Sequence, residues 1–109
     1  MKGRIIMAKY LSNAFSIQML TGASNTVQFD EVDPQTIDQE NLVSVLGHTD
    51  IANVVSNVLG KEYPVNRVSN KLEKGDIMYV AQLIGGRLPE GATSLPEGFS
   101  IKWYEVTVI

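Results

Sequence analysis

The residues of this chain whose types suit chemistry stand where hydrophobic segments begin or end. They are Asn13 and Ser16, His48, Arg67, Gln82, and Arg87 with Glu90. Side chains placed at the ends of neighbouring elements can converge on one ligand. His48, the only histidine, follows a glycine and precedes Thr49 and Asp50, which have the residue types of a helix cap. An imidazole beside the start of a helix suits acid chemistry on a phosphate.

Three of the four ionisable residues of this set have plainer interpretations as well. His48 could only cap or pack at the start of the helix. Arg87, in a loop rich in glycine, could be a solvated surface charge. Glu90 could pair with Arg87, orient His48 or face solvent. As an anion it is a poor direct contact for a phosphate, and the sequence leaves these alternatives open.

The four polar residues that remain have alternatives of the same kind. Asn13 has the residue type of a helix cap, which is compatible with binding a phosphate at the same helix start. Ser16, one turn further on, could point its hydroxyl at the same ligand or lie on the surface. Arg67 and Gln82 fall in predicted strands, where they could contact a ligand, support a loop at the site or pair across strands.

Composition limits the class of protein. A chain of 109 residues forms one domain, residues 1–109, whose core a partner subunit could help to complete. The absence of cysteine excludes disulfides and thiolate metal sites, and one histidine leaves no His-rich ligand set, so we expect no metal and no cofactor. The net charge of −3 argues against coating of duplex nucleic acid but permits a small anionic ligand.

The hydropathy pattern predicts a cytoplasmic protein. No apolar run reaches the roughly 18 residues that a membrane-spanning helix requires. The apolar stretch near the beginning is too short and too polar for a secretory signal. We therefore expect neither a membrane partner nor export.

The periodicity of apolar residues predicts an α/β domain, a mixed sheet flanked by helices. Strands are expected at residues 4–11, 26–32, 65–72, 76–84 and 101–109, and helices at residues 14–20, 33–46 and 51–59. The last of these helices has the clearest apolar spacing, and Gly60 ends it. A turn at Lys74, Gly75 and Asp76 predicts that strands 65–72 and 76–84 pair antiparallel. Residues 85–98 form a long irregular stretch, and such loops are often functional.

Five separated runs make the chain similar to a known family. They are residues 11–20 (LSNAFSIQML), 46–48 (LGH), 66–76 (NRVSNKLEKGD), 79–82 (YVAQ) and 87–91 (RLPEG). Over roughly residues 8–91 they resemble, in order and spacing, the viral ring nucleases that act as type III anti-CRISPR proteins and their bacterial relatives. Members often begin near Met7, so residues 1–6 are expected to be an extension. Gly85 and Gly86 stand where relatives often have larger polar residues, and the spacing from Gln82 to Arg87 is one residue longer.

The resemblance implies a homodimeric, metal-independent phosphodiesterase. Its substrate is cyclic tetra-adenylate, the second messenger of type III CRISPR defence, and its products are linear di-adenylates ending in a 2′,3′-cyclic phosphate. Such an enzyme switches off the nucleases that the messenger activates, in the host cytoplasm if the chain is viral. The catalytic residues implied are His48, Arg87 and Glu90, and the substrate-binding residues are Asn13, Ser16, Arg67 and Gln82.

Two alternatives belong to other functional classes. One is a sponge, which binds the messenger without cleaving it and does not need His48. The other is a structural or regulatory protein with no nucleotide ligand. Cleavage separates the first alternative from the enzyme, and a ligand-induced change in thermal stability separates the second from both.

Overall fold

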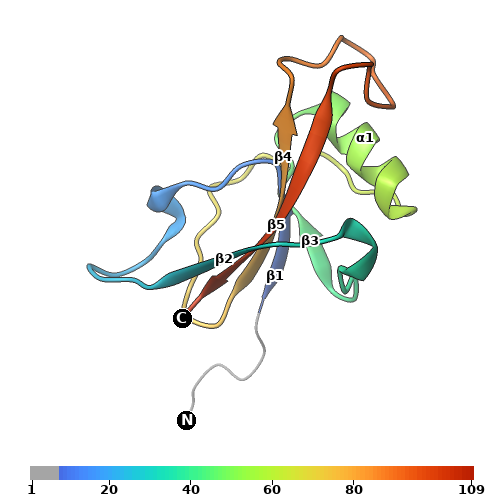
Figure 1. Cartoon of the computed structure of the whole chain (residues 1–109). Coiled ribbons are helices and arrows are strands. Elements are labelled where there is room, and N and C mark those ends of the chain that lie inside the picture. The colour runs from blue at the N-terminus through green and yellow to red at the C-terminus, as the bar shows by residue number, and fades with distance from the viewer. Residues whose placement is uncertain (1–7) are drawn as a thin grey trace.

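The computed structural model describes residues 8–109, which form a five-stranded mixed sheet with an α-helix against one face (Figure 1). The elements are β1 (Lys9–Ser12), η1 (Ile17–Met19), β2 (Val27–Glu31), η2 (Pro34–Thr36), β3 (Leu42–Ser44), α1 (Thr49–Leu59), β4 (Ile77–Ile84) and β5 (Ser100–Val108), where η1 and η2 are short 3₁₀ helices. The order of strands in the sheet is β2-β5-β4-β1-β3. The predicted fold class, one compact α/β domain with a mixed sheet, is confirmed.

The directions of the strands decide where a site can form. β1 runs parallel to both of its neighbours, β3 and β4, whereas β5 pairs antiparallel with β4 and with β2. The carboxyl ends of β1, β3 and β4 therefore lie at one edge of the sheet, the upper edge in Figure 1. Side chains that follow these strands are brought together there, and in α/β sheets this edge is the usual place for ligands.

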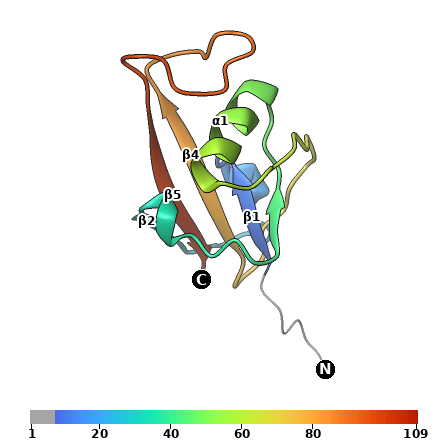
Figure 2. The same cartoon turned by 90° about the vertical axis from the view of Figure 1, so that its right-hand side faces the viewer.

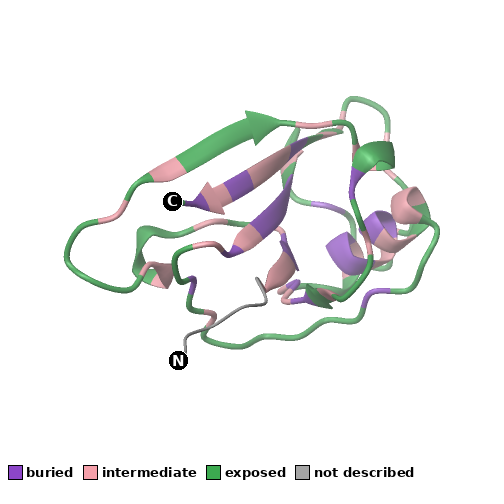
Figure 3. Cartoon of the chain, turned by 90° about the horizontal axis from the view of Figure 1, so that it is seen from below, coloured by how far each residue is buried: buried purple, intermediate pink, exposed green. Residues whose placement is uncertain are grey.

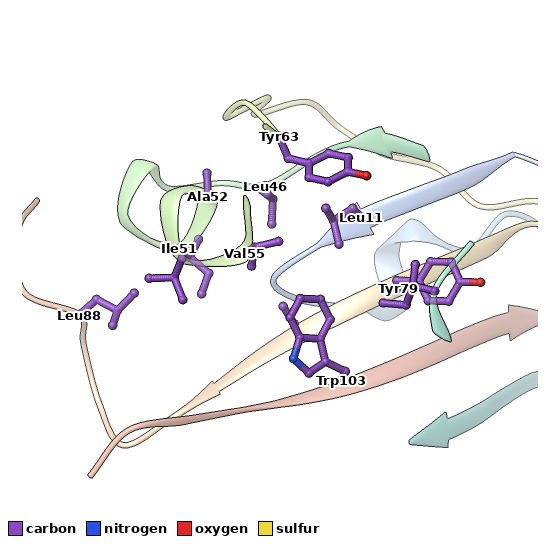
Figure 4. Packing of buried hydrophobic residues seen from close by; sticks show 12 residues of the cluster. Leu11, Leu46, Ile51, Ala52, Val55, Tyr63, Tyr79, Leu88 and Trp103 are labelled. Carbon is purple, nitrogen blue, oxygen red and sulfur yellow. The ribbon is translucent and has the colours of Figure 1, made fainter. Parts of the chain in front are cut away.

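Helix α1 covers one face of the sheet. Four of its residues, Ile51, Ala52, Val54 and Val55, are buried, and Gly60 ends the helix in a left-handed conformation with φ 74°. The buried side packs on residues of the sheet such as Leu11 and Trp103, as Figure 4 shows, and Tyr79 belongs to the same apolar cluster. Each large apolar side chain buried in this way contributes roughly 1.5–3 kcal/mol, so this interface fixes the helix on the sheet.

Irregular chain covers the opposite face. The buried cluster there consists of Leu72, Met78, Val80, Val106 and Val108, against which Phe15, Met19 and Leu20 pack. The N–H of Leu72 donates to the carbonyl of Met19 at 2.6 Å, which joins the two covering segments. Figure 3 shows that β2, at the edge of the sheet, is largely exposed.

The predicted helix at residues 33–46 is wrong. Asp33 and Pro34 do begin a helical turn, but it is only η2, and residues 42–44 form β3 beside β1. Asn41 adopts φ 57°, which interrupts a right-handed helix, and asparagine tolerates this conformation. Pairing with β1 satisfies the backbone of β3, so tertiary structure overrides the helical spacing of the apolar residues.

Two further expectations are corrected. Residues 14–20 form only η1, which begins after Ser16, so Asn13 caps no helix there. Residues 65–72 are not a strand: they make single bridges, Leu46 with Val65 and Leu20 with Leu72, and β4 pairs instead with β1 and β5. The reason is that β4 pairs along its whole length with β5 and over residues 77–80 with β1, whereas the chain before Gly75 closes the opposite face of the sheet.

The remaining elements agree with the sequence to within a few residues. The helix that ends at Gly60 and the strands β2, β4 and β5 all lie where the apolar patterns predict them. Residues 4–7 of the first predicted strand, and the extension expected at residues 1–6, lie outside the described residues. From residue 8 to residue 109, no helix has the length and apolar character needed to cross a membrane.

Candidate functional site

A cavity of about 560 Å³ opens at the carboxyl ends of the parallel strands, beside the start of α1. Its lining consists of Asn13, His48, Asp50, Ile51, Gln82, Leu83, Arg87, Leu88 and Glu90. Five of the seven predicted site residues are among them: Asn13, His48, Gln82, Arg87 and Glu90. The volume falls within the roughly 300–1,000 Å³ usual for ligand sites. The fold thus brings together residues that are up to 77 positions apart in the chain, from Asn13 to Glu90.

His48 occupies the residue position immediately before α1. Its backbone is extended, with φ −142° and ψ 143°, and its carbonyl accepts the N–H of Ala52 at 3.0 Å. The imidazole is exposed and makes no capping hydrogen bond, so the interpretation of His48 as a side-chain cap does not hold. Thr49 and Asp50, predicted as the cap, are the first residues of the helix itself. The imidazole is therefore available to a ligand.

The peptide that precedes His48 is held from two sides. The N–H of Gly47 donates to Asn13 Oδ1 at 3.0 Å, and the carbonyl of Gly47 accepts Arg67 Nε at 2.7 Å. Asn13 thereby links the end of β1 to the β3–α1 connection, while its amide NH₂ remains a donor at the cavity that Asn13 lines. With both polar groups of Gly47 bonded, the backbone fixes the direction from which His48 enters the cavity.

Gln82 comes from the last part of β4. It is exposed, it lines the cavity, and it lies opposite Lys102 of β5 in the antiparallel register. The prediction that Gln82 belongs to a strand is confirmed. Its amide offers both a donor and an acceptor to whatever occupies the cavity.

The loop of residues 85–99 connects β4 to β5 and reaches over the start of α1 (Figure 2). Gly85 and Gly86 open it with φ 121° and φ 122°. A Cβ atom on Gly85 would lie 3.0 Å from the carbonyl oxygen of Gly98 and 3.0 Å from Cα of Phe99. Only glycine allows the two ends of the loop to approach so closely at this φ.

Arg87 and Glu90 are exposed residues of this loop, on either side of the buried Leu88 and the exposed Pro89. Within residues 8–109 no ion pair joins Arg87 to Glu90, and no hydrogen bond joins Glu90 to His48. The pairings considered for Glu90 are therefore absent from this conformation. Arg87 and Glu90 both line the cavity, and they do not form an ion pair with each other.

Ser16 and Arg67 do not line the cavity. Ser16 caps η1, because its Oγ accepts the N–H of Gln18 at 3.3 Å. Arg67 lies in irregular chain rather than in a strand, and its contact is with the backbone of Gly47. Of the roles considered from the sequence, the structure shows Arg67 supporting the segment that presents His48.

Asp50 is the polar residue of the cavity lining that was not among the predicted site residues. It is half-buried, and its Oδ1 accepts the N–H of Gly91 at 2.9 Å. Its position two residues after His48 is the available signal, but its residue type and place in the sequence predict only a helix cap. The partner stands 41 positions further along the chain, so only the fold reveals the contact.

A second hollow, of about 710 Å³, lies along the other flank of α1. Its lining is Thr49, Ala52, Asn53, Ser56, Asn57, Gly60, Lys61, Glu62, Tyr63, Pro64, Val65 and Thr93. It contains no imidazole or guanidinium group, so its larger volume does not make it the better candidate for acid chemistry. Within residues 8–109 no group of three or more histidine and carboxylate side chains is placed to hold a metal ion.

The fold and the cavity define a class of small α/β proteins. In this class an imidazole, a guanidinium and amide groups lie together where the parallel strands of a mixed sheet end. The chain belongs to the STIV B116-like family, whose model matches residues 9–102. Its structure is similar to B116 of Sulfolobus turreted icosahedral virus, with a TM-score of 0.76 and 28% identity over 92% of this chain and 98% of the other. It is also 27% identical over 89 residues to ORF116 of Acidianus filamentous virus 1 (isolate United States/Yellowstone), covering 78% of this chain and 76% of that protein. The family to which the chain belongs therefore includes viral proteins.

Proposed function

We propose that this protein is a ring nuclease, a metal-independent phosphodiesterase that opens cyclic tetra-adenylate and so ends type III CRISPR signalling. The observation that supports this most strongly is the shared cavity, in which the exposed imidazole of His48 meets Arg87 and two amide side chains, Asn13 and Gln82. This set can bind a phosphodiester and donate a proton to it. The resemblance of the sequence to ring nucleases supplies the identity of the substrate.

The reaction uses the substrate's own 2′-hydroxyl as the nucleophile. Its oxygen attacks the adjacent phosphorus, the 2′-O–P bond forms, and the bond from phosphorus to the 5′-oxygen breaks. Holding the attacking and leaving oxygens in line supplies a large part of the acceleration. Asn13 and Gln82 line the cavity and are assigned to hold the nucleotide in this geometry.

His48 is the general acid. It gives a proton to the leaving 5′-oxygen, and the 2′-hydroxyl loses its own proton to solvent water as the cyclic phosphate forms. A positioned general acid contributes roughly 10²–10⁴-fold to the rate. The extended backbone of His48 and the two bonds to Gly47 restrain the imidazole's attachment point, which favours such positioning.

Arg87 stabilises the pentavalent phosphorane. Its planar guanidinium can donate two parallel hydrogen bonds to non-bridging phosphate oxygens, and charge-assisted bonds of this type are stronger than neutral ones. Glu90 is assigned to orient Arg87 or His48 once the substrate is bound, because a carboxylate is a poor direct contact for a phosphate. Ser16 and Arg67, which lie outside the cavity in the single chain, are left with supporting roles.

A homodimer suits the symmetry of the substrate. A cyclic tetranucleotide can be divided into two equivalent halves, and a two-fold dimer would present one cavity to each half. Pairing two cavities also doubles the focused positive groups of an acidic chain without changing its net charge of −3 per subunit.

The test is incubation of the purified protein with cyclic tetra-adenylate in EDTA, with the products separated by chromatography and identified by mass. We expect linear di-adenylates with a 2′,3′-cyclic phosphate from the wild type and none from His48→Ala. Thr49→Ala, which changes the exposed neighbouring residue, is the matched control and should cleave normally. Tight binding without product would identify a sponge, and no binding at all would remove the nucleotide from consideration.

A further inference from the structure

Helix α1 holds the loop of residues 85–99 at three points. Asp50 Oδ1 accepts the N–H of Gly91 at 2.9 Å. Seven residues and about two turns further along the helix, the amide of Asn57 donates to the carbonyl of Thr93. Leu88 is buried in the same apolar cluster as Ile51, and Figure 4 shows the two side chains next to each other. The loop therefore packs against α1 and is hydrogen-bonded to it.

The three contacts differ in what they can control. The bond between Asn57 and Thr93 belongs to the second hollow, on the far flank of the helix. Leu88 anchors the loop by burial, a contact that lacks the direction a hydrogen bond imposes. Among the residues that make these contacts, Asp50 is the polar residue that lines the cavity. It binds the backbone N–H directly after Glu90.

The charge of Asp50 argues against a direct role on the substrate. A carboxylate repels a phosphodiester, so a contact between the two would weaken binding. Its oxygen is already engaged by the N–H of Gly91, and a charged acceptor makes a stronger hydrogen bond to a backbone donor than a neutral one does. The contact that Asp50 makes is therefore with the loop.

We propose that Asp50 is a positioning residue, which holds the N–H of Gly91 so that Arg87 and Glu90 face His48 across the cavity. Its effect on cleavage rests on the ring nuclease activity proposed above, whereas its effect on the loop does not. The hydrogen bond between Asp50 and Gly91 joins the first turn of α1 to the loop segment that contains Arg87, the residue assigned to phosphate binding. His48 and its opposing loop are then both positioned from the same end of one helix.

The effect on the loop is measured by limited trypsin digestion of the full chain without ligand, following cleavage after Arg87. Backbone segments that open more often are cut faster. We expect Asp50→Ala to be cut about fivefold faster than the wild type at this bond, and Asp50→Asn, which keeps an acceptor oxygen, to stay within about twofold. Glu62→Ala removes one exposed carboxylate near the other end of the helix and should leave the rate unchanged.

The effect on the reaction is measured as kcat and as messenger affinity, the latter in a His48→Ala background so that no turnover interferes. We expect Asp50→Ala to lower kcat about tenfold, with affinity changed less than about threefold, because the loop loses position rather than a ligand contact. Asp50→Asn should recover most of kcat. Asparagine retains the size of the side chain, so the comparison holds even if alanine weakens the start of α1.

The outcomes separate the two proposals. Equal trypsin rates for wild type and Asp50→Ala would overturn the positioning role whether or not the protein cleaves the messenger. Equal kcat losses in Asp50→Ala and Asp50→Asn would also overturn it, because charge rather than the hydrogen bond would then matter. Faster digestion of Asp50→Ala together with a wild type that makes no product would sink the ring nuclease and, with it, the catalytic consequence assigned to Asp50.

Discussion

The two segments that bring ionisable groups to the cavity are restrained in different ways. The peptide before His48 is held by its own backbone, because Asn13 and Arg67 bind the N–H and the carbonyl of Gly47. The loop of residues 85–99 is held by Leu88 in the core and by bonds at Gly91 and Thr93, none of which is made by the backbone of Arg87 or Glu90 itself. Arg87 itself follows two glycines and is exposed.

The difference fits what each group has to do in the proposed reaction. A general acid must meet one leaving oxygen within hydrogen-bonding distance, so small displacements cost much of its effect. A long arginine side chain reaches its phosphate through several rotatable bonds and tolerates movement of the backbone beneath it. The segment with the tighter backbone restraints presents the acid, and the looser one presents the arginine.

The largest effect should come from the loop's charge. We expect Arg87→Ala to reduce cleavage of cyclic tetra-adenylate by about 10²–10³-fold, because a preorganised donor to the transition state is lost. Stability should change by less than about 0.5 kcal/mol, since the side chain is exposed. Single-turnover kinetics and urea denaturation measure the two quantities.

Arg87→Lys is the matched variant, and it should recover only part of the rate because an ammonium group cannot donate two parallel bonds. A rate for Arg87→Ala close to that of the wild type would show that the transition state is stabilised elsewhere. The loop would then contribute no more to catalysis than the segment that presents His48.

The next effect should appear in stability. Leu88→Ala removes the apolar anchor of the loop, and we expect the free energy of unfolding to fall by about 2 kcal/mol, at the lower end for a buried leucine because Leu88 lies at the margin of the core. Chemical denaturation followed by Trp103 fluorescence measures it. Ser94→Ala, an exposed position in the same loop, is the control and should have almost no effect. An equal loss in both variants would mean that burial of Leu88 does not hold the loop.

Residues 33–46 show where prediction of the fold ends. The sequence has a good helix start at Asp33 and Pro34 and apolar residues at helical intervals, and η2 confirms the start. The rest is decided by the partner that β1 needs on its open side, which no local pattern encodes. Helix α1 was predictable because its apolar spacing, its burial and Gly60 all agree, so local and tertiary preferences do not compete.

The site was partly predictable for a related reason. Asn13, His48, Gln82 and Arg87 stand at the ends of elements, and the parallel arrangement of β1, β3 and β4 brings such ends together. Arg67 and Asp50 act through the backbone of residues that are distant in sequence, Gly47 and Gly91. A side chain's type indicates its chemistry, but its backbone partner is known only once the fold is known.

The smallest effect should come from loosening the restrained peptide. Asn13→Ala leaves the N–H of Gly47 without its acceptor, and we expect a loss of about 1 kcal/mol in the free energy of unfolding, together with slower cleavage. Urea denaturation and product formation measure both. Asn25→Ala is the control, because the amide of Asn25 makes only an exposed local bond to the carbonyl of Gly22. Normal cleavage by Asn13→Ala would show that restraint of Gly47 is not needed to place the acid.

The pairing of Ile84 with Ser100 has an evolutionary consequence. These residues close the β4–β5 hairpin ladder, so the sheet is complete without any residue of the loop between them. Doubling the length of a flexible loop costs only about 0.6 kcal/mol of closure entropy. Insertions, deletions and substitutions between the two strands can therefore accumulate while the scaffold stays intact, provided that an apolar residue still reaches the core where Leu88 does. Under the proposed function, exchange of this loop alone would be enough to alter the preference of the cavity for its ligand.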